Sequence, residues 1–187
     1  MILFLKKKKG RQYMVISQPT ISKLLNQLDS EVNILQTSLN EVRFITQDLI
    51  QELSTDNLPD YINSLFVDDE ITFMLSYINK HKFQITVHQH YIDLSIFFYD
   101  KNNNVTTLTI RYVISADKTV MLINQYNYDD LSTSILKDLQ YAHINLEYIK
   151  EHKHVHIGTI TSIAKSINNI LEFDDNELIN LYTLYQY

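Results

Sequence analysis

Histidine is the residue type whose spacing in this chain comes nearest to a chemical pattern. His88 and His90 are separated by one residue, and so are His154 and His156. Alternate residues of a β-strand point to the same face, so each pair predicts two imidazoles that could hold a divalent metal such as zinc. His143 and His152 could supply further ligands.

The same histidines also have structural interpretations. His88 and His90 fall on the polar face of a predicted strand, and His143 lies at the edge of an apolar helical stripe. His152 and His154 follow a predicted helix C-terminus, where the helix dipole favours an imidazolium ion. The sequence holds no HExxH motif. We therefore expect no cofactor, and we expect a chelator to leave the melting temperature unchanged.

Carboxylates offer a second chemistry. Asp93 and Arg111 are predicted to face each other across two strands, with Ser95, His88 and His90 on the same face of the sheet. This group is the basis for a hydrolase that uses a metal or a carboxylate with histidine. The acidic clusters elsewhere precede predicted helices, whose N-termini favour negative charge. These clusters are Asp68 to Glu70, Asp129 with Asp130, and Asp174 with Asp175.

Composition places the chain among globular proteins and removes several enzyme classes. Hydrophobic residues make up 45% of the 187, and cysteine is absent, which excludes disulfides and thiolate sites. Gly10 and Gly158 are the only glycines, so phosphate-binding loops and nucleophile elbows are disfavoured. No apolar run approaches the roughly 18 residues of a membrane span. We expect a cytoplasmic protein with no membrane partner, from a phage or mobile element of an AT-rich genome.

Residues 1–13 are interpreted as a non-native or disordered extension. They hold five of the 16 basic residues and none of the 22 acidic ones, and Lys8-Lys9-Gly10-Arg11 matches a purine-rich ribosome-binding sequence before Met14. We therefore predict translation from Met14 and a single domain over 14–187, with a net charge of −11 instead of −6. The alternative is a basic arm that contacts phosphates or anionic lipid.

An apolar heptad seam lies between Ile21 and Leu53. Its members recur at alternating steps of three and four residues, and Thr46 fills the one interrupted position. An unbroken helix predicts a partner for this seam, whereas a break near Asp29 and Ser30 predicts two shorter helices packed on the sheet. The predicted interaction residues are Leu25, Leu28, Val32, Leu35, Leu39 and Val42, and the seam continues through Leu49 and Leu53.

Residues 17–29 read Ser-Gln-Pro-Thr-Ile-Ser-Lys-Leu-Leu-Asn-Gln-Leu-Asp and resemble the recognition helix of LysR-type and related winged-helix regulators. The resemblance implies a DNA-binding regulator in which two preceding helices hold this one in the major groove. Ser17 or Thr20 as N-cap, with Pro19 in the first turn, explains the same residues in an ordinary helix. The acidic body repels nucleic acid, so we expect no nucleic-acid partner.

Period-two alternation begins at Phe83 and predicts four strands, over 83–87, 92–99, 108–114 and 120–122. A hairpin around the loop at 100–104 keeps the apolar faces of the second and third strands together. It sets Leu94 opposite Ile110, Ile96 opposite Leu108, and Asp93 opposite Arg111. The predicted sheet is an antiparallel four-stranded meander over about 83–125.

Helices are predicted before and after this meander, over 19–80 and 130–186, which makes the chain an α+β protein. In the first region, a helical turn covers Tyr61–Phe66, and a segment capped by Asp68 or Asp69 is either a helix or a strand. In the second region, one helix capped by Asp129 or Asp130 extends to Ile149, and another covers 157–171. Asp174 and Glu177 form a capping box for the last helix.

The sequence as a whole favours a non-enzymatic regulatory protein that binds another protein or a second copy of itself. Enzyme motifs are absent, and the seam offers an apolar surface. Phe97 and Tyr99 on the outer sheet face and the tyrosines of the C-terminal tail also suit an interface.

Overall fold

The computed structural model describes residues 4–8, 11–15, 18–53, 64–67, 70–76, 81–124 and 127–186. The chain divides into two compact units, Met1–Ser38 and Leu39–Tyr187. One helix, α1 (Gln18–Glu52), belongs to both units and shows no break at Asp29 or Ser30. The seam therefore lies on a single continuous helix.

The first unit contains a hairpin and the N-terminal half of α1. Strands β1 (Phe4–Lys8) and β2 (Arg11–Val15) pair antiparallel, with Lys8 opposite Arg11. The described residues that precede α1 thus form strands, not the two helices of a winged-helix arrangement. The start of translation at Met14 stays a prediction.

The second unit is built on a mixed sheet in the order β3-β4-β5-β6-β7-β9-β8. The prediction of a four-stranded antiparallel meander was therefore wrong in size and in direction, because β7 and β9 run parallel. The strands are β3 (Ser64–Val67), β4 (Glu70–Ser76), β5 (Lys82–Val87), β6 (Tyr91–Tyr99), β7 (Val105–Ile114), β8 (Met121–Ile123) and β9 (Val155–Gly158).

Two strands occupy the region that was predicted to be helical up to residue 80. Strand β4 pairs with β5, and β3 pairs with β4, both antiparallel. The period-two pattern of Ile71, Phe73 and Leu75 is obscured by Met74 in the alternate phase. Pairing with β5 determines the conformation, as expected where local preference is ambiguous. The helix-capping role of Asp68 and Asp69 lies outside the described residues.

Strand β9 separates the third and fourth predicted strands. It pairs parallel with β7 and antiparallel with β8, so β8 forms an edge of the sheet instead of a neighbour of β7. Ile157, which was assigned to a helical pattern, is a buried residue of this strand. A Cβ atom at Gly158 would lie 2.6 Å from Ser162 Oγ and 2.9 Å from Val120 Cγ2, so this crossing needs glycine.

The C-terminal region forms four helices, α2 (Thr133–Tyr141), α3 (Leu146–Glu151), α4 (Ile160–Leu171) and α5 (Asp175–Gln186). The single helix predicted up to Ile149 is two helices, because His143 has a φ of 57° and Asn145 caps α3 through Tyr148 N. The N-cap of α2 is Ser132, not Asp129 or Asp130. The capping box before α5 is confirmed by reciprocal hydrogen bonds between Asp174 and Glu177.

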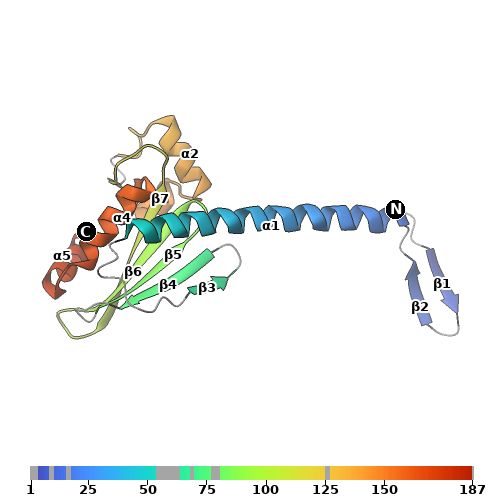
Figure 1. The fold of residues 1–187 in the computed structure, drawn as a ribbon, viewed down its shortest axis with the longest axis horizontal. Coiled ribbons are helices and arrows are strands. Elements are labelled where there is room, and N and C mark those ends of the chain that lie inside the picture. The colour runs from blue at the N-terminus through green and yellow to red at the C-terminus, as the bar shows by residue number, and fades with distance from the viewer. Residues whose placement is uncertain are drawn as a thin grey trace. The chain divides into compact units, whose positions relative to one another are not determined.

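Helices cover both faces of the sheet (Figure 1). One face packs on α4, α5 and the buried end of α1, where Val42, Leu49 and Leu53 enter the core. The hydroxyl of Thr46 donates to Val42 O at 2.7 Å, which satisfies this polar group within the core. The other face packs on α2 and α3. Among the described residues, no helix combines the length and the apolar character that a bilayer span requires.

Candidate functional site

The apolar seam of α1 divides into an exposed part and a buried part. Leu25, Leu28, Val32 and Leu35 are exposed, with Leu28 at 55% and Leu35 at 62% of full exposure. Leu39 is half-buried, and Val42 is completely buried in the core of the second unit. Of the six predicted interaction residues, the first four thus form an open surface, which we call the apolar stripe. Leu24 (53%) flanks it.

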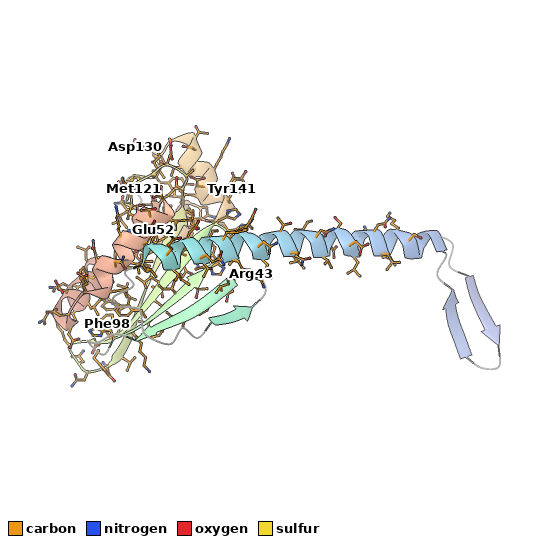
Figure 2. The ribbon with its side chains drawn as sticks, viewed as in Figure 1. Arg43, Glu52, Phe98, Met121, Asp130 and Tyr141 are labelled. Carbon is orange, nitrogen blue, oxygen red and sulfur yellow. The ribbon has the colours of Figure 1, made fainter. Side chains whose placement is uncertain are left out.

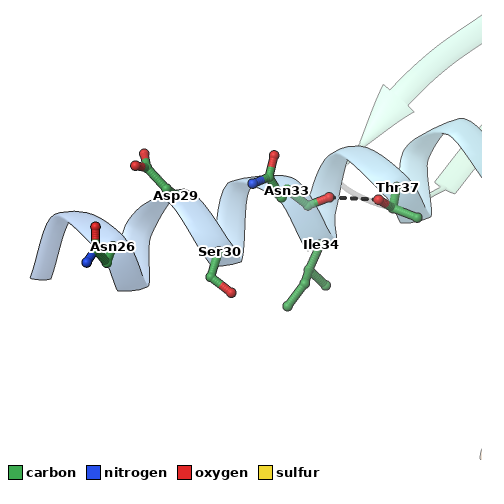
Figure 3. Close-up of a pocket in the computed structure, with 6 residues that line it drawn as sticks. All are labelled: Asn26, Asp29, Ser30, Asn33, Ile34 and Thr37. Atoms are coloured by element: carbon green, nitrogen blue, oxygen red, sulfur yellow. Dashed lines mark hydrogen bonds between the residues drawn. The ribbon is translucent and has the colours of Figure 1, made fainter. Parts of the chain in front are cut away.

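A polar hollow lies on the N-terminal half of the same helix (Figure 3). Its lining residues are Asn26, Asp29, Ser30, Asn33, Ile34 and Thr37, all from α1. The hydroxyl of Thr37 donates to Asn33 O at 2.9 Å, a bond within the helix. The six described residues come from one side of one helix, so they supply no opposing wall for a small ligand.

His88 and His90 lie in the connection between β5 and β6, not on a strand as predicted. The backbone N–H of His88 donates to Tyr91 O at 2.9 Å, which closes the turn, and His90 O accepts from Ile114 N at 2.9 Å. His88 Nε2 is 3.4 Å from Glu70 Oε2, and its ring stacks on Tyr91 at 4.1 Å. The tight turn ends the alternation that the H-x-H spacing assumes.

A pocket of about 680 Å³ lies beside this turn, and we call it the histidine pocket. The C-terminal end of α2 forms its second wall (Tyr141 is labelled in Figure 2). The ring of Tyr141 stacks on that of His90, with the ring centroids 5.5 Å apart. The described residues that line it are three histidines, two tyrosines, two glutamines and a lysine: His88, His90, His143, Tyr91, Tyr141, Gln89, Gln140 and Lys137. Lys137 and Tyr141 could not be predicted from the sequence, because only folding brings α2 to the turn.

His154 and His156 lie against α5, on the face of the sheet that α1, α4 and α5 cover. His156 Nε2 is 2.7 Å from the hydroxyl of Tyr185, and the His154 ring is 5.6 Å from the ring of Tyr185. The Nδ1 atoms of both histidines are buried and have no hydrogen-bond partner among the described residues. Burial, reinforced by His154, lowers the pKa of His156 to about 4. Burial also lowers the pKa of His154 and raises that of Tyr185 to about 12.

Asp93 and Arg111 are directly opposite each other in the β6–β7 ladder, in the register that the alternation predicted. Arg111 Nε and Nη2 donate to the two Asp93 carboxylate oxygens at 2.7 and 2.6 Å. The guanidinium carbon lies 4.0 Å from the ring centre of Tyr91 and 5.2 Å from that of Tyr148. This arrangement fixes a cation between a carboxylate and two aromatic rings.

The residues suggested for hydrolase chemistry do not share one site. Ser95 Oγ is 3.0 Å from Thr109 Oγ1, whereas His88 and His90 lie beyond the end of the strand. His152 stacks on Tyr148 at 4.1 Å, and its Nδ1 is 3.1 Å from Tyr148 O. In the part of the chain that the structure describes, no three side chains from His, Cys, Asp or Glu are placed to hold a metal ion.

Comparisons with protein-family models, with curated proteins and with solved structures find no significant match to this chain.

Proposed function

We propose that this chain is a non-enzymatic interaction protein that self-associates through the apolar stripe of α1. The observation that supports this proposal is the exposure of Leu25, Leu28, Val32 and Leu35 on one continuous helix. Full burial of a leucine or valine side chain contributes ~1.5–3 kcal/mol, and these are about half exposed. Each therefore offers on the order of 1 kcal/mol to a partner that covers it.

A second copy of the chain is the occupant that the stripe itself suits. Alternating steps of three and four residues are the spacing at which two identical helices interlock as a coiled coil. In heptad terms, Leu25 and Val32 are a positions, and Leu28 and Leu35 are d positions. Of the two a residues, only Val32 is β-branched, and a β-branched residue at a with leucine at d favours two strands over three or four.

The residues beside the stripe favour a parallel pair. In a parallel coiled coil, each g position contacts the next e position of the other helix. This places Leu24 beside the second copy's Asp29, and Glu31 beside its Gln36, so no like charges meet. An antiparallel pair centred on the same segment would bring the two copies of Asp29 together and the two copies of Glu31 together, which is unfavourable.

The test is light scattering of the full chain over a range of concentrations. We expect a dimer that L28E/L35E converts to a folded monomer, because both side chains are exposed in the single chain and the change removes only the stability that association adds. The matched control is Ile34→Glu, since Ile34 is 63% exposed on the same helix but lies outside the seam. This control should remain a dimer. A wild-type monomer at every concentration would overturn the proposal, and so would equal dissociation of the control.

Orientation can be tested separately, because the chain contains no cysteine. Leu28→Cys places a single thiol at a d position, where the two copies face each other only in the parallel, in-register pair. Mild oxidation should then give a covalent dimer. The same change at Ile34 should not.

A further inference from the structure

The histidine pocket gathers hydrogen-bond donors and cationic groups from two parts of the second unit. The β5–β6 turn supplies His88 and His90, and the end of α2 supplies Lys137 and His143. None of the described residues that line the pocket is acidic, although the chain has 22 acidic residues and a net charge of −6. A pocket of about 680 Å³ has the size of small-molecule sites.

Two carboxylates contact residues in the walls of the pocket. Glu70 of β4 lies 3.4 Å from His88 Nε2, and Glu41 of α1 accepts a hydrogen bond from the Gln89 amide. Both interactions orient the side chains of the turn. None of the described residues forms an ion pair with Lys137. Its ammonium group is therefore available to a ligand.

We propose that the histidine pocket binds a tetrahedral oxyanion, the phosphate or sulfate group of a small ligand. Lysine ammonium groups, protonated imidazoles and glutamine amides all donate hydrogen bonds to such oxygens. The proposal is independent of self-association through the apolar stripe, because none of the stripe residues lines this pocket.

Calorimetric titration of the full chain with sulfate tests the proposal. We expect saturable binding, because the pocket brings a lysine ammonium group together with imidazole and glutamine hydrogen-bond donors. Sodium chloride at equal ionic strength should produce no such heat. A parallel titration with inorganic phosphate assigns the ligand class, since the tighter of the two anions identifies it.

Two variants and one control locate the binding. Lys137→Gln and His143→Asn should each weaken sulfate binding about tenfold, and asparagine tolerates the positive φ of 57° at position 143. Lys150→Gln is the control, because Lys150 is a half-exposed lysine of α3 that pairs with Glu147 outside the pocket. Absence of saturation, or an unchanged affinity in Lys137→Gln, would overturn the proposal.

Discussion

The two faces of the central strands have the same register but are stabilised in different ways. On one face, Leu94 and Ile110 are completely buried beneath α1, α4 and α5. On the other, Asp93 pairs with Arg111, and Ser95 with Thr109, in half-buried cross-strand contacts. A single alternation thus places a continuous apolar core on one side and a row of separate polar pairs on the other.

The largest expected difference between the faces comes from truncating a core residue. Leu94→Ala should lower the free energy of unfolding by ~2–5 kcal/mol, because it leaves a cavity in a packed interior. Ser95→Ala, its neighbour on the opposite face, should cost less than ~1 kcal/mol, since it removes one half-exposed hydrogen bond. Urea unfolding of both variants measures the difference. Equal costs would mean that the polar face contributes as much as the core.

His156 is a titratable residue on the apolar face of the sheet, and its protonation should make the stability of the fold depend on pH. Its pKa is lowered to about 4 in the folded chain, whereas an unfolded histidine titrates near 6.5. The unfolded state therefore gains a proton first, so this stabilisation is present above about pH 6.5 and is lost as the pH falls towards 4. The loss should be at most ~3 kcal/mol, because His156 retains some exposure.

Urea unfolding at several pH values between these limits measures that loss. His156→Gln should flatten the dependence, and His88→Gln, in the turn beside Glu70, is the control that should flatten it less. A wild-type stability that is constant between about pH 6.5 and 5 would contradict the argument.

The register of β6 and β7 could be predicted from sequence because its determinants are local. Alternation on both strands and a five-residue loop left one pairing that buries Leu94 and Ile110 together. The loop also stabilises this pairing. Asp100 Oδ1 accepts hydrogen bonds from Asn102 N and Asn104 N, and these bonds fix the turn between the two strands.

The insertion of β9 could not be predicted in the same way. Strand β9 has four residues and pairs with a strand about forty residues earlier, so neither its length nor its neighbour is visible in a local pattern. The His154 and His156 site depends on this strand and on Tyr185 of α5. The spacing of the histidines was therefore informative about a shared face, but not about what covers that face.

The seam of α1 shows a different limit. Its heptad spacing is uniform, yet Leu28 is exposed and Val42 is completely buried. Periodicity gives the face of a helix and cannot give the element that packs against it. The break between α2 and α3 was missed because the apolar positions continue across His143, whose positive φ ends the helix.

The smallest effect concerns the ion pair on the polar face. Asp93→Asn should lower the free energy of unfolding by ~1–2 kcal/mol, because it weakens two charge-assisted hydrogen bonds and leaves a half-buried guanidinium. Replacing both residues, as in D93T/R111V, should cost less than the single change, since no unpaired charge remains. Urea unfolding of the two variants measures how much stability each change removes.

A double variant that loses more stability than Asp93→Asn would show that Arg111 acts chiefly through its contacts with the rings of Tyr91 and Tyr148, at 4.0 and 5.2 Å. In that case the polar face would be held by aromatic packing as well as by charge, and the contrast between the two faces of the sheet would be smaller than the hydrogen bonds alone indicate.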